Sequence, residues 1–464
     1  MQAAFAAQRR AFEAERSPAL AVRLDRLRRL EALTTLHERD IARAISADFG
    51  SRSAHETTLG ETLVALAAIR HARRHLRRWM KPRRARTRFY FRPGYGRIVR
   101  QPLGVAGIVS PWNYAFQLAM CPAAAALAAG NRVMIKPSEV TPRFSELLAA
   151  IVEKQFAPDE ITVVTGDRSV AQTFVRLPFD HLLFTGSTEV GRDVAIAAAA
   201  NLTPVTLELG GKSPAIVDGD VRLDAVARRL MTGKLFNAGQ TCVAPDYALV
   251  RDDCIEPLLR ELRASVAAIY PTLAANTDYT SIVDDRHYAR VQAIIEDARA
   301  KGARVMEINP AGEPLTRQAR KIAPTVLVGV DEGMRAMQEE IFGPVLPIVG
   351  FERIEDAIAY VNRRPRPLAL YFFGDSAAHR DRVLSETVSG GVTVNGTLWH
   401  YVQEDMPFGG VGKSGYGAYH GEAGFRTFSN EKAVFYEPWW SGLGVLRPPY
   451  GRRVERVIAL LRRL

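Results

Sequence analysis

Strand-like and helix-like segments alternate between residues 103 and 207, and this alternation constrains the fold more than any other feature of the sequence. Short apolar runs such as Gly104–Ser110 and His181–Phe184 are separated by stretches with helical spacing, such as Leu118–Ala129 and Val190–Ala200. Strands joined by a helical crossover pair in parallel. The segment is therefore predicted to form a parallel sheet covered by helices, the α/β architecture of dinucleotide-binding domains.

The alternation continues through about residues 210–390. Strand-like runs occur at Ala215–Val217 and Tyr247–Val250, and helix-like segments at Ala225–Leu235 and Tyr288–Lys301. This part of the chain is predicted to form a second α/β domain.

The ends of the chain have patterns of their own. Leucines three and four positions apart from Leu20 to Leu36 predict that residues 1–80 are largely helical. Apolar residues on both sides of Pro93-Gly94-Tyr95-Gly96 predict a β-hairpin over residues 83–102. Residues 448–464 end in an amphipathic stretch that we expect to dock against the body of the protein or a partner subunit. Peripheral contact with a membrane surface is the alternative.

The composition is that of a globular protein with room for two or three domains, since the chain has 464 residues, 47% of them hydrophobic and 24% charged. No apolar run reaches the roughly eighteen residues of a spanning helix, so no membrane span is expected. The three cysteines, Cys121, Cys242 and Cys254, are too few for a disulfide framework and indicate a reducing compartment. A cytoplasmic location is therefore predicted.

The formal net charge is +12, and much of the excess comes from arginines at Arg70–Arg88 and Arg452–Arg463. Such a surface could attract nucleic acid, an acidic membrane or an anionic cofactor. No zinc-ligand spacing or RNA-binding signature accompanies it. The arginines are therefore interpreted as a solvated face, with no nucleic-acid partner and no metal site predicted.

Two stretches carry residues suited to covalent chemistry on a carbonyl group. Cys242 lies in Phe236–Pro245, among small and amide residues that let backbone donors and a substrate come close. Glu208 follows an apolar run, where a strand would deliver it into a cleft. A thiol that attacks and a carboxylate that moves protons are the minimum for this chemistry. A free cysteine is more often a small buried apolar residue, and Cys121 and Cys254 keep that interpretation.

Seven motifs then occur in order along the chain. They are Pro111-Trp112-Asn113-Tyr114, Lys136-Pro137-Ser138-Glu139, Phe184-Thr185-Gly186-Ser187, Glu208-Leu209-Gly210-Gly211, Gly239-Gln240-Thr241-Cys242, Glu339-Glu340-Ile341-Phe342-Gly343-Pro344 and Pro407-Phe408-Gly409-Gly410. Together they resemble the aldehyde dehydrogenase superfamily. The stretch Pro407–Gly421 is similar to its class 3 branch, which includes fatty-aldehyde and coniferyl-aldehyde enzymes. The resemblance implies NAD(P)-dependent oxidation of an apolar aldehyde to the carboxylate, through a cysteine thiohemiacetal and thioester.

The resemblance implies a catalytic role for each of three residues. Cys242 corresponds to the nucleophile, and Glu208 to the general base that activates the hydrolytic water. Asn113 corresponds to a side-chain donor to the oxyanion, with the backbone N–H of Cys242 as the second donor.

The same resemblance implies NAD as the cofactor, with NADP as the alternative. Gly186 and Ser187 follow a strand and open a helix, so we expect them to meet the pyrophosphate. Trp112 is expected on the same side of the cleft.

Four further residues correspond to positions that hold the rest of the cofactor. Lys136 and Glu139 correspond to residues near the adenosine ribose, where a carboxylate favours NAD because it repels a 2′-phosphate. Glu340 and Phe342 correspond to the residues at the nicotinamide ribose and ring. The neighbouring Glu339 is excluded only by its position in the motif.

The patterns and the resemblance together predict how the chain is divided and assembled. The predicted parts are an NAD(P)-binding domain (1–82 and 103–208), a catalytic domain (209–390), a small β oligomerisation module (83–102 and 391–436, with strands near 391–396 and 424–436) and an amphipathic tail (437–464). Such a hairpin has exposed strand edges that pairing with a second subunit would cover. The resemblance implies a homodimer.

The substrate is expected to be an apolar aldehyde. Tyr114, Phe116, Trp399 and Tyr401 are plausible wall residues, whereas His400 is interpreted as structural. Three alternatives stay open: an enzyme that passes the acyl group to coenzyme A or phosphate, an inactive scaffold, and a nucleic-acid-binding protein. Glu208 favours hydrolysis, because that route needs an activated water.

Overall fold

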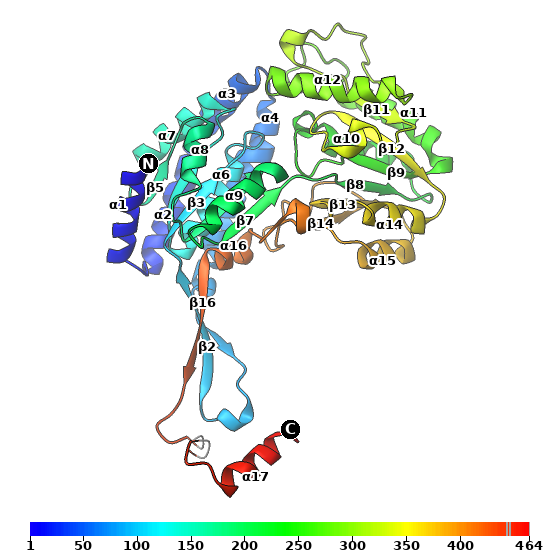
Figure 1. Cartoon of the computed structure of the whole chain (residues 1–464). Helices are drawn as coiled ribbons and strands as arrows, with labels where there is room; N and C mark the ends of the chain where they lie inside the picture. The colour runs from blue at the N-terminus through cyan, green and yellow to red at the C-terminus, as the bar shows by residue number, and fades with distance from the viewer. Residues whose placement is uncertain (442–443, 445–446, 464) are drawn as a thin grey trace.

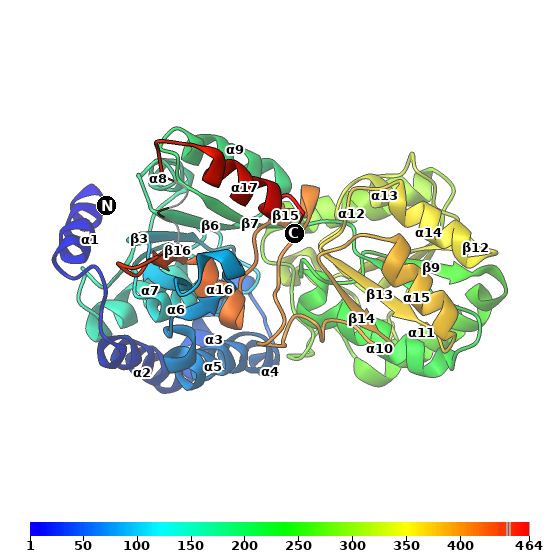
Figure 2. The ribbon, with the colours of Figure 1, turned by 90° about the horizontal axis from the view of Figure 1, so that it is seen from below.

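The structure is a computed structural model that describes residues 1–441, 444 and 447–463. Two α/β lobes lie side by side, and a narrow three-stranded sheet projects away from the first lobe (Figures 1 and 2). The first lobe is built on a six-stranded sheet and the second on a seven-stranded sheet.

The six-stranded sheet has the order β15-β7-β6-β3-β4-β5. Its strands are β3 (Val105–Val109), β4 (Arg132–Lys136), β5 (Ile161–Val163), β6 (His181–Gly186), β7 (Val205–Leu209) and β15 (Gly415–Tyr416). All neighbours pair in parallel except β15, which is antiparallel to β7. The parallel α/β sheet predicted for residues 103–207 is confirmed.

Helices cover both faces of this sheet because successive strand residues point to opposite sides. In β6, Leu182 and Phe184 pack into one apolar cluster, and Leu183 packs into another. The first cluster includes residues of α1 (Gln2–Ala14), α8 (Arg168–Phe174) and α9 (Thr188–Ala199). The second includes residues of α2 (Leu20–Leu36), α3 (Glu38–Phe49), α5 (Leu63–Trp79), α6 (Gln117–Ala129) and α7 (Pro142–Gln155). Between α3 and α5 lie α4 (Ala54–Thr57) and a π-helical turn, η1 (Thr58–Thr62). The helical prediction for residues 1–80 is confirmed.

The seven-stranded sheet of the second lobe has the order β10-β11-β12-β9-β8-β13-β14. Its strands are β8 (Pro214–Val217), β9 (Tyr247–Arg251), β10 (Arg304–Glu307), β11 (Thr325–Val328), β12 (Val345–Phe351), β13 (Ala369–Phe373) and β14 (Gly391–Val394). Its helices are α10 (Leu223–Leu235), α11 (Ile255–Ile269), α12 (Asp285–Ala300), α13 (Arg335–Gln338), α14 (Ile354–Asn362) and α15 (Ala377–Glu386). Only β10 is antiparallel to its neighbour. The expected second α/β domain thus has a mostly parallel sheet.

The projecting sheet consists of β1 (Arg83–Ala85), β2 (Tyr95–Pro102) and β16 (Ser429–Tyr436), all antiparallel. The predicted hairpin is present. A strand from the 424–436 segment was expected to join it, and β16, which covers the later part of that segment, does so. Residues 424–427 instead belong to a helix, α16 (Gly421–Thr427).

The expectation that residues 391–396 join the projecting sheet is wrong. β14 pairs in parallel with β13 at the edge of the seven-stranded sheet. The physical reason is that β13, α15 and β14 form a strand–helix–strand unit, whose crossover returns the chain beside β13.

The tail contains a helix, α17 (Arg452–Leu461), which lies beyond the far end of the projecting sheet and away from both lobes (Figure 1). The expectation that it docks against the body of its own chain is therefore not met, while Leu464 lies outside the described residues. Within the described residues, no helix is both long and apolar enough to cross a membrane.

Candidate active site

A cleft of about 1000 Å³ takes lining residues from both lobes. Eight of the ten residues singled out by the sequence line it: Trp112, Asn113, Gly186, Ser187, Glu208, Cys242, Glu340 and Phe342. Five of them, from Trp112 to Glu208, lie at the carboxyl ends of parallel strands or in the loops that follow, which is where open α/β sheets place ligands. Cys242, Glu340 and Phe342 instead lie in loops that follow the helices α10 and α13 and precede the strands β9 and β12.

Cys242 follows a sharply coiled turn, η3 (Phe236–Gly239). Asn237 and Ala238 have φ of +54° and +51°, and Gly239 has φ of +76°. A Cβ atom at Gly239 would clash with the carbonyl of Gly343, so only glycine fits there. Such backbone strain persists only where surrounding contacts hold it, and it is concentrated at functional sites.

Hydrogen bonds from buried amides hold this turn. The Asn237 side chain donates to the carbonyls of Asn113, at 3.1 Å, and Gln240, at 3.2 Å. The Gln240 side chain donates to Asn237 O and Ser281 O, and accepts from the backbone N–H of Val283. Asn237 and Gln240 are thus the residues that position Cys242.

The thiol of Cys242 is partly buried. Burial first, and then the carboxylates of Glu340 and Glu208, raise its pKa to about 12. Cys242 is therefore a protonated thiol at neutral pH, and its attack on a carbonyl requires a group that removes the proton.

Glu208 lies on β7 opposite Gly415 of β15, and only 3% of it is exposed. Neither carboxylate oxygen has a hydrogen-bond partner among the described residues. Burial raises the pKa of this carboxyl well above its usual range. A buried, unpaired carboxyl in a reaction cleft is suited to accept and release a proton.

Asn113 is buried beside Cys242, and its side-chain amide donates to Gln240 O at 3.1 Å. An amide nitrogen carries two hydrogens, so the second one is free for a further acceptor. The carbonyl of Asn113 accepts from Arg52 at 2.9 Å and from Asn237.

Arg52 and Glu61 form a fully buried ion pair behind Asn113, with 2.9 Å between Nη1 and Oε1. The second carboxylate oxygen of Glu61 accepts from the backbone N–H groups of Phe116 and Gln117. Neither residue is predicted to be functional from the sequence, because charged residues between the leucines of a helix usually lie on its solvated face. No signal in the sequence distinguishes these two.

The N-terminus of α9 faces the cleft through Gly186, Ser187, Thr188 and Glu189. Ser187 is the N-cap residue, and its hydroxyl accepts from the N–H of Val190 at 3.4 Å. The side-chain hydroxyl of Thr185 is buried without a partner among the described residues. Free N–H groups and the helix dipole at such a terminus fit an anionic pyrophosphate.

Glu340 and Phe342 approach the cleft from the second lobe. Burial first, then the charge of Asp246, raises the pKa of Glu340 to about 8. A Cβ at Gly210 would clash with the Glu340 carboxylate, so this glycine is needed for the close approach. Phe342 has φ of +51°, and its ring lies edge-on to Trp112 with 5.4 Å between centroids.

Glu339 is also at the cleft but is engaged elsewhere. Its carboxylate pairs with Arg290 at 3.2 Å and with Arg335 at 2.9 Å. The two adjacent glutamates, which sequence alone could not tell apart, therefore differ in their environment.

Lys136 and Glu139 do not line the cleft. Lys136 ends β4, its Nζ donates to Pro137 O at 2.6 Å, and it lies 3.8 Å from the Glu139 carboxylate. β4 pairs in parallel with β3, and β3 with β6. Lys136 therefore lies at the same carboxyl end of the sheet as Gly186, two strands away.

Aromatic and apolar side chains line the part of the cleft beside Cys242. They include Tyr114, Leu118, Phe236, Leu398, Trp399, Tyr401, Phe408 and Tyr419. Phe116, expected here, is instead fully buried in the core, because it faces Phe144 of α7. His400 is bonded to Thr393 at 2.8 Å and does not line the cleft, as its structural interpretation implies.

Known proteins resemble this chain over nearly all of its length. The family model described as the aldehyde dehydrogenase family matches residues 1–434. A probable coniferyl aldehyde dehydrogenase of Pseudomonas aeruginosa is 47% identical, over 99% of this chain and 95% of that protein. Aldehyde dehydrogenase family 3 member A2 of Rattus norvegicus is 39% identical, over 91% of this chain and 86% of that protein.

Two solved structures extend the comparison. AldH of Staphylococcus aureus, in a substrate-bound state, superposes with a TM-score of 0.94 at 36% identity, covering 99% of each chain. The P. syringae indole-3-acetaldehyde dehydrogenase in complex with NAD+ has a TM-score of 0.85 at 26% identity, covering 94% of this chain and 88% of that one. The resemblance suggested by the seven motifs is confirmed, class 3 relatives included: this chain belongs to the aldehyde dehydrogenase family.

Proposed function

We propose that this enzyme oxidises an aromatic aldehyde of the coniferyl type to its carboxylate, with NAD+ as hydride acceptor. The observation that carries the proposal is the convergence of Cys242, Glu208 and Asn113 on a cleft walled by aromatic rings. The name of the relative at 47% identity supports the substrate class. A long aliphatic aldehyde would meet the same apolar wall and is the alternative.

In the proposed reaction the sulfur of Cys242 bonds to the aldehyde carbon, and the thiol proton passes to a solvent water in the cleft. Asn113 and the backbone N–H of Cys242 donate to the oxyanion. When bound, NAD+ would supply the hydride acceptor for that carbon, which would then be held on Cys242 as a thioester. Glu208 then removes a proton from a water as the water oxygen attacks the thioester carbon and the carbon–sulfur bond breaks.

The environment of Glu208 supports its role as the base. The raised pKa of Glu208 makes its carboxylate a stronger base toward the water that it deprotonates. Its oxygens accept no hydrogen bond from other groups in the described part of the chain. This hydrolytic equipment favours release of the acid over transfer of the acyl group to coenzyme A or phosphate.

The remaining cleft residues would bind the cofactor. Gly186 and Ser187 at the start of α9 would hold the pyrophosphate, with Trp112 beside them. Glu340 and Phe342 would hold the nicotinamide ribose and ring. Two further residues, Lys136 and Glu139, would reach the adenosine ribose from the same sheet edge, and the Glu139 carboxylate favours NAD over NADP.

The assembly proposed is a homodimer formed through the projecting sheet. β1 and β16 are its two outer strands, and β16 exposes Phe435 and Tyr436. Unpaired strand edges with apolar side chains are usually covered by another chain. We also propose that α17 contacts the partner subunit. A cytoplasmic location agrees with three cysteines that are all free.

The test of the function is reduction of NAD+ or NADP+ followed at 340 nm, with the wild type beside Cys242→Ala. Coniferaldehyde, benzaldehyde, hexanal and hexadecanal form the substrate panel, and Cys254→Ala is the matched control. We expect turnover with coniferaldehyde that is lost in Cys242→Ala and kept in Cys254→Ala. Preference for hexadecanal would overturn the substrate class. A folded protein that binds NAD+ but oxidises no aldehyde would overturn the function.

A further inference from the structure

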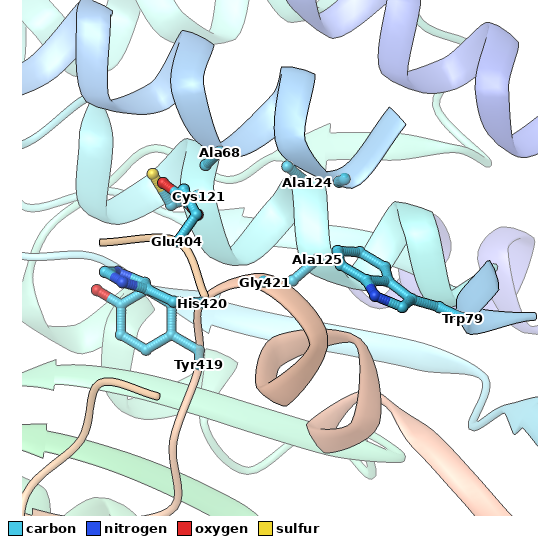
Figure 3. Close-up of a pocket in the computed structure, with 10 residues that line it drawn as sticks. Ala68, Trp79, Cys121, Ala124, Ala125, Glu404, Tyr419, His420 and Gly421 are labelled. Atoms are coloured by element: carbon cyan, nitrogen blue, oxygen red, sulfur yellow. The ribbon is translucent and has the colours of Figure 1, made fainter. Parts of the chain in front are cut away.

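A second, small cavity of about 20 Å³ shares a lining residue with the catalytic cleft; its lining is drawn in Figure 3. Trp79 of α5, Cys121 of α6, Glu404, Tyr419 and His420 are among its lining residues. Tyr419 lines both this cavity and the cleft that contains Glu208 and Cys242. Tyr419 therefore borders both spaces.

Polar atoms without protein partners surround the cavity. They are both ring nitrogens of His420, the hydroxyl of Tyr419 and Nε1 of Trp79, none of which has a partner within the described ranges. His420 is 5% exposed, and Tyr419 and Trp79 are each 1% exposed. Buried polar groups are almost always hydrogen-bonded, to protein or to ordered water. A cavity of this size with several polar groups around it fits a buried water.

The backbone holds these groups rigidly. His420 has φ of +108°, a conformation that L-residues rarely adopt, and its ring is wedged between the rings of Tyr401, Phe408 and Tyr419. A Cβ at Gly421 would clash with the carbonyl of Glu404, so the two segments are closely apposed. Strain of this kind is kept where the surroundings over-determine the conformation, which is frequent at functional sites.

Glu404 lies at the outer side of the cavity. Figure 3 shows its carboxylate beside the sulfur of Cys121, with the ring of His420 nearby. Glu404 is partly exposed, and the adjacent Asp405 is in solvent, where it lies 3.4 Å from His71 of α5. Glu404 thus has access both to the cavity and to the outside.

We propose that this cavity holds an ordered water which, together with Tyr419 and His420, passes the proton taken up by Glu208 out to Glu404 and from there to solvent. The proposal rests on the proposed function, because it needs the hydrolytic step. Proton exit is a requirement of that step: Glu208 is buried, and it must lose its proton before the next turnover.

The transfer balances without any redox change. The Tyr419 hydroxyl accepts a proton from the Glu208 side and gives its own to the water in the cavity. His420 is neutral, because burial and His400 lower its pKa to about 3, so one ring nitrogen accepts while the other donates. The Glu404 carboxylate accepts the proton and releases it to bulk water.

The charges support this direction of transfer. Tyr419 is close enough to Glu208 for that carboxylate to raise its pKa, after the larger effect of burial. Burial, and then Asp405, raise the pKa of Glu404 to about 7, so this carboxyl exchanges protons near neutrality. The other groups facing Glu404 are the thiol of Cys121, whose pKa burial raises, and the neutral His420.

The test measures proton release directly, by stopped flow with a pH indicator, alongside NADH formation at 340 nm. In Glu404→Gln, we expect the first NADH to form within about twofold of the wild-type rate, while proton release and later turnovers slow about tenfold. A small added buffer such as imidazole should restore proton release in Glu404→Gln. Asp405→Asn, the same charge change on the solvent side, should match the wild type.

Two further readouts separate a relay from a structural role. Wild-type proton release should slow as the pH falls below about 7, where Glu404 becomes protonated, and Glu404→Gln should lose this dependence. A crystal structure should show a water bonded to His420 and Tyr419. Unchanged proton release in Glu404→Gln, an equal loss of the first NADH in that variant, or a dry cavity would each overturn the relay. A wild type that makes no NADH would instead overturn the proposed function.

Discussion

At the scale of single residues, burial disfavours the charged form of both reactive groups. Burial raises the pKa of the Cys242 thiol to about 12 and raises that of the Glu208 carboxyl well above its usual range. The resting cleft therefore holds a neutral thiol beside a carboxyl that favours its protonated form. This avoids two like charges in a cleft of low polarity, and proton removal becomes part of the reaction.

The pH dependence of the reaction follows from these shifts. Both active forms, thiolate and carboxylate, become more populated as pH rises, so kcat/KM should increase from neutral to alkaline pH.

In Glu208→Gln, the first NADH should still form and the thioester should accumulate, because the base for its hydrolysis is gone. Rapid-quench mass spectrometry of Cys242 would detect the acyl group, with Glu189→Gln as control. Normal steady-state turnover in Glu208→Gln would contradict the assignment.

At the scale of elements, the π-helical turn η1 carries Glu61 into the core behind the active site. There Glu61 pairs with Arg52 and accepts from the backbone N–H groups of Phe116 and Gln117, while Arg52 donates to the carbonyl of Asn113. The helical N-terminal region is thus connected to the oxyanion donor by a buried ion pair. Both side chains are fully buried, so solvent cannot replace a lost partner.

Removal of one partner should therefore be costly. Arg52→Met leaves the Glu61 carboxylate uncompensated, and we expect the free energy of unfolding to fall by about 3–5 kcal/mol. The double variant Arg52→Met/Glu61→Gln should recover part of this loss, because the buried charge is gone. Urea unfolding followed by circular dichroism measures both, with exposed Arg43→Met as control. A single variant as stable as the wild type would show that the pair is not needed.

At the scale of the whole molecule, the active site belongs to both lobes, whereas the projecting sheet belongs to neither. Cleft residues come from β7 and α9 of the first lobe and from the Cys242 and Glu340 loops of the second. The projecting sheet has its own pairing and leaves aromatic side chains exposed. Catalysis and assembly are therefore separable by mutation.

The exposed face of β16 should control assembly. Phe435→Glu places a charge among aromatic residues, and we expect the dimer to dissociate toward monomer in sedimentation velocity at micromolar concentration. The lobes should keep their secondary structure, because Phe435 is outside both cores. Lys432→Gln on the same strand is the control and should leave the dimer intact. A dimer that survives Phe435→Glu would place the interface elsewhere.

Much of the fold could be predicted because it follows from local patterns. Short apolar runs and helical spacing predicted the strands and helices of residues 103–207, and turn residues predicted the hairpin. β14 was misplaced because four residues, Gly391–Val394, carry no sign of which sheet edge they join. Phe116 was misplaced because an aromatic residue fits a core as well as a substrate wall.

The sequence by itself determined the α/β class, the family and the identity of eight residues that meet in one cleft, because these depend on local patterns and ordered motifs. The tertiary structure alone decided which charges are buried. Arg52 and Glu61 are ordinary charged residues in the sequence, and only the packing of distant segments around them removes their water. Desolvation depends on neighbours remote in the chain, so the ion pair behind Asn113 and the cavity beside the cleft became visible only in three dimensions.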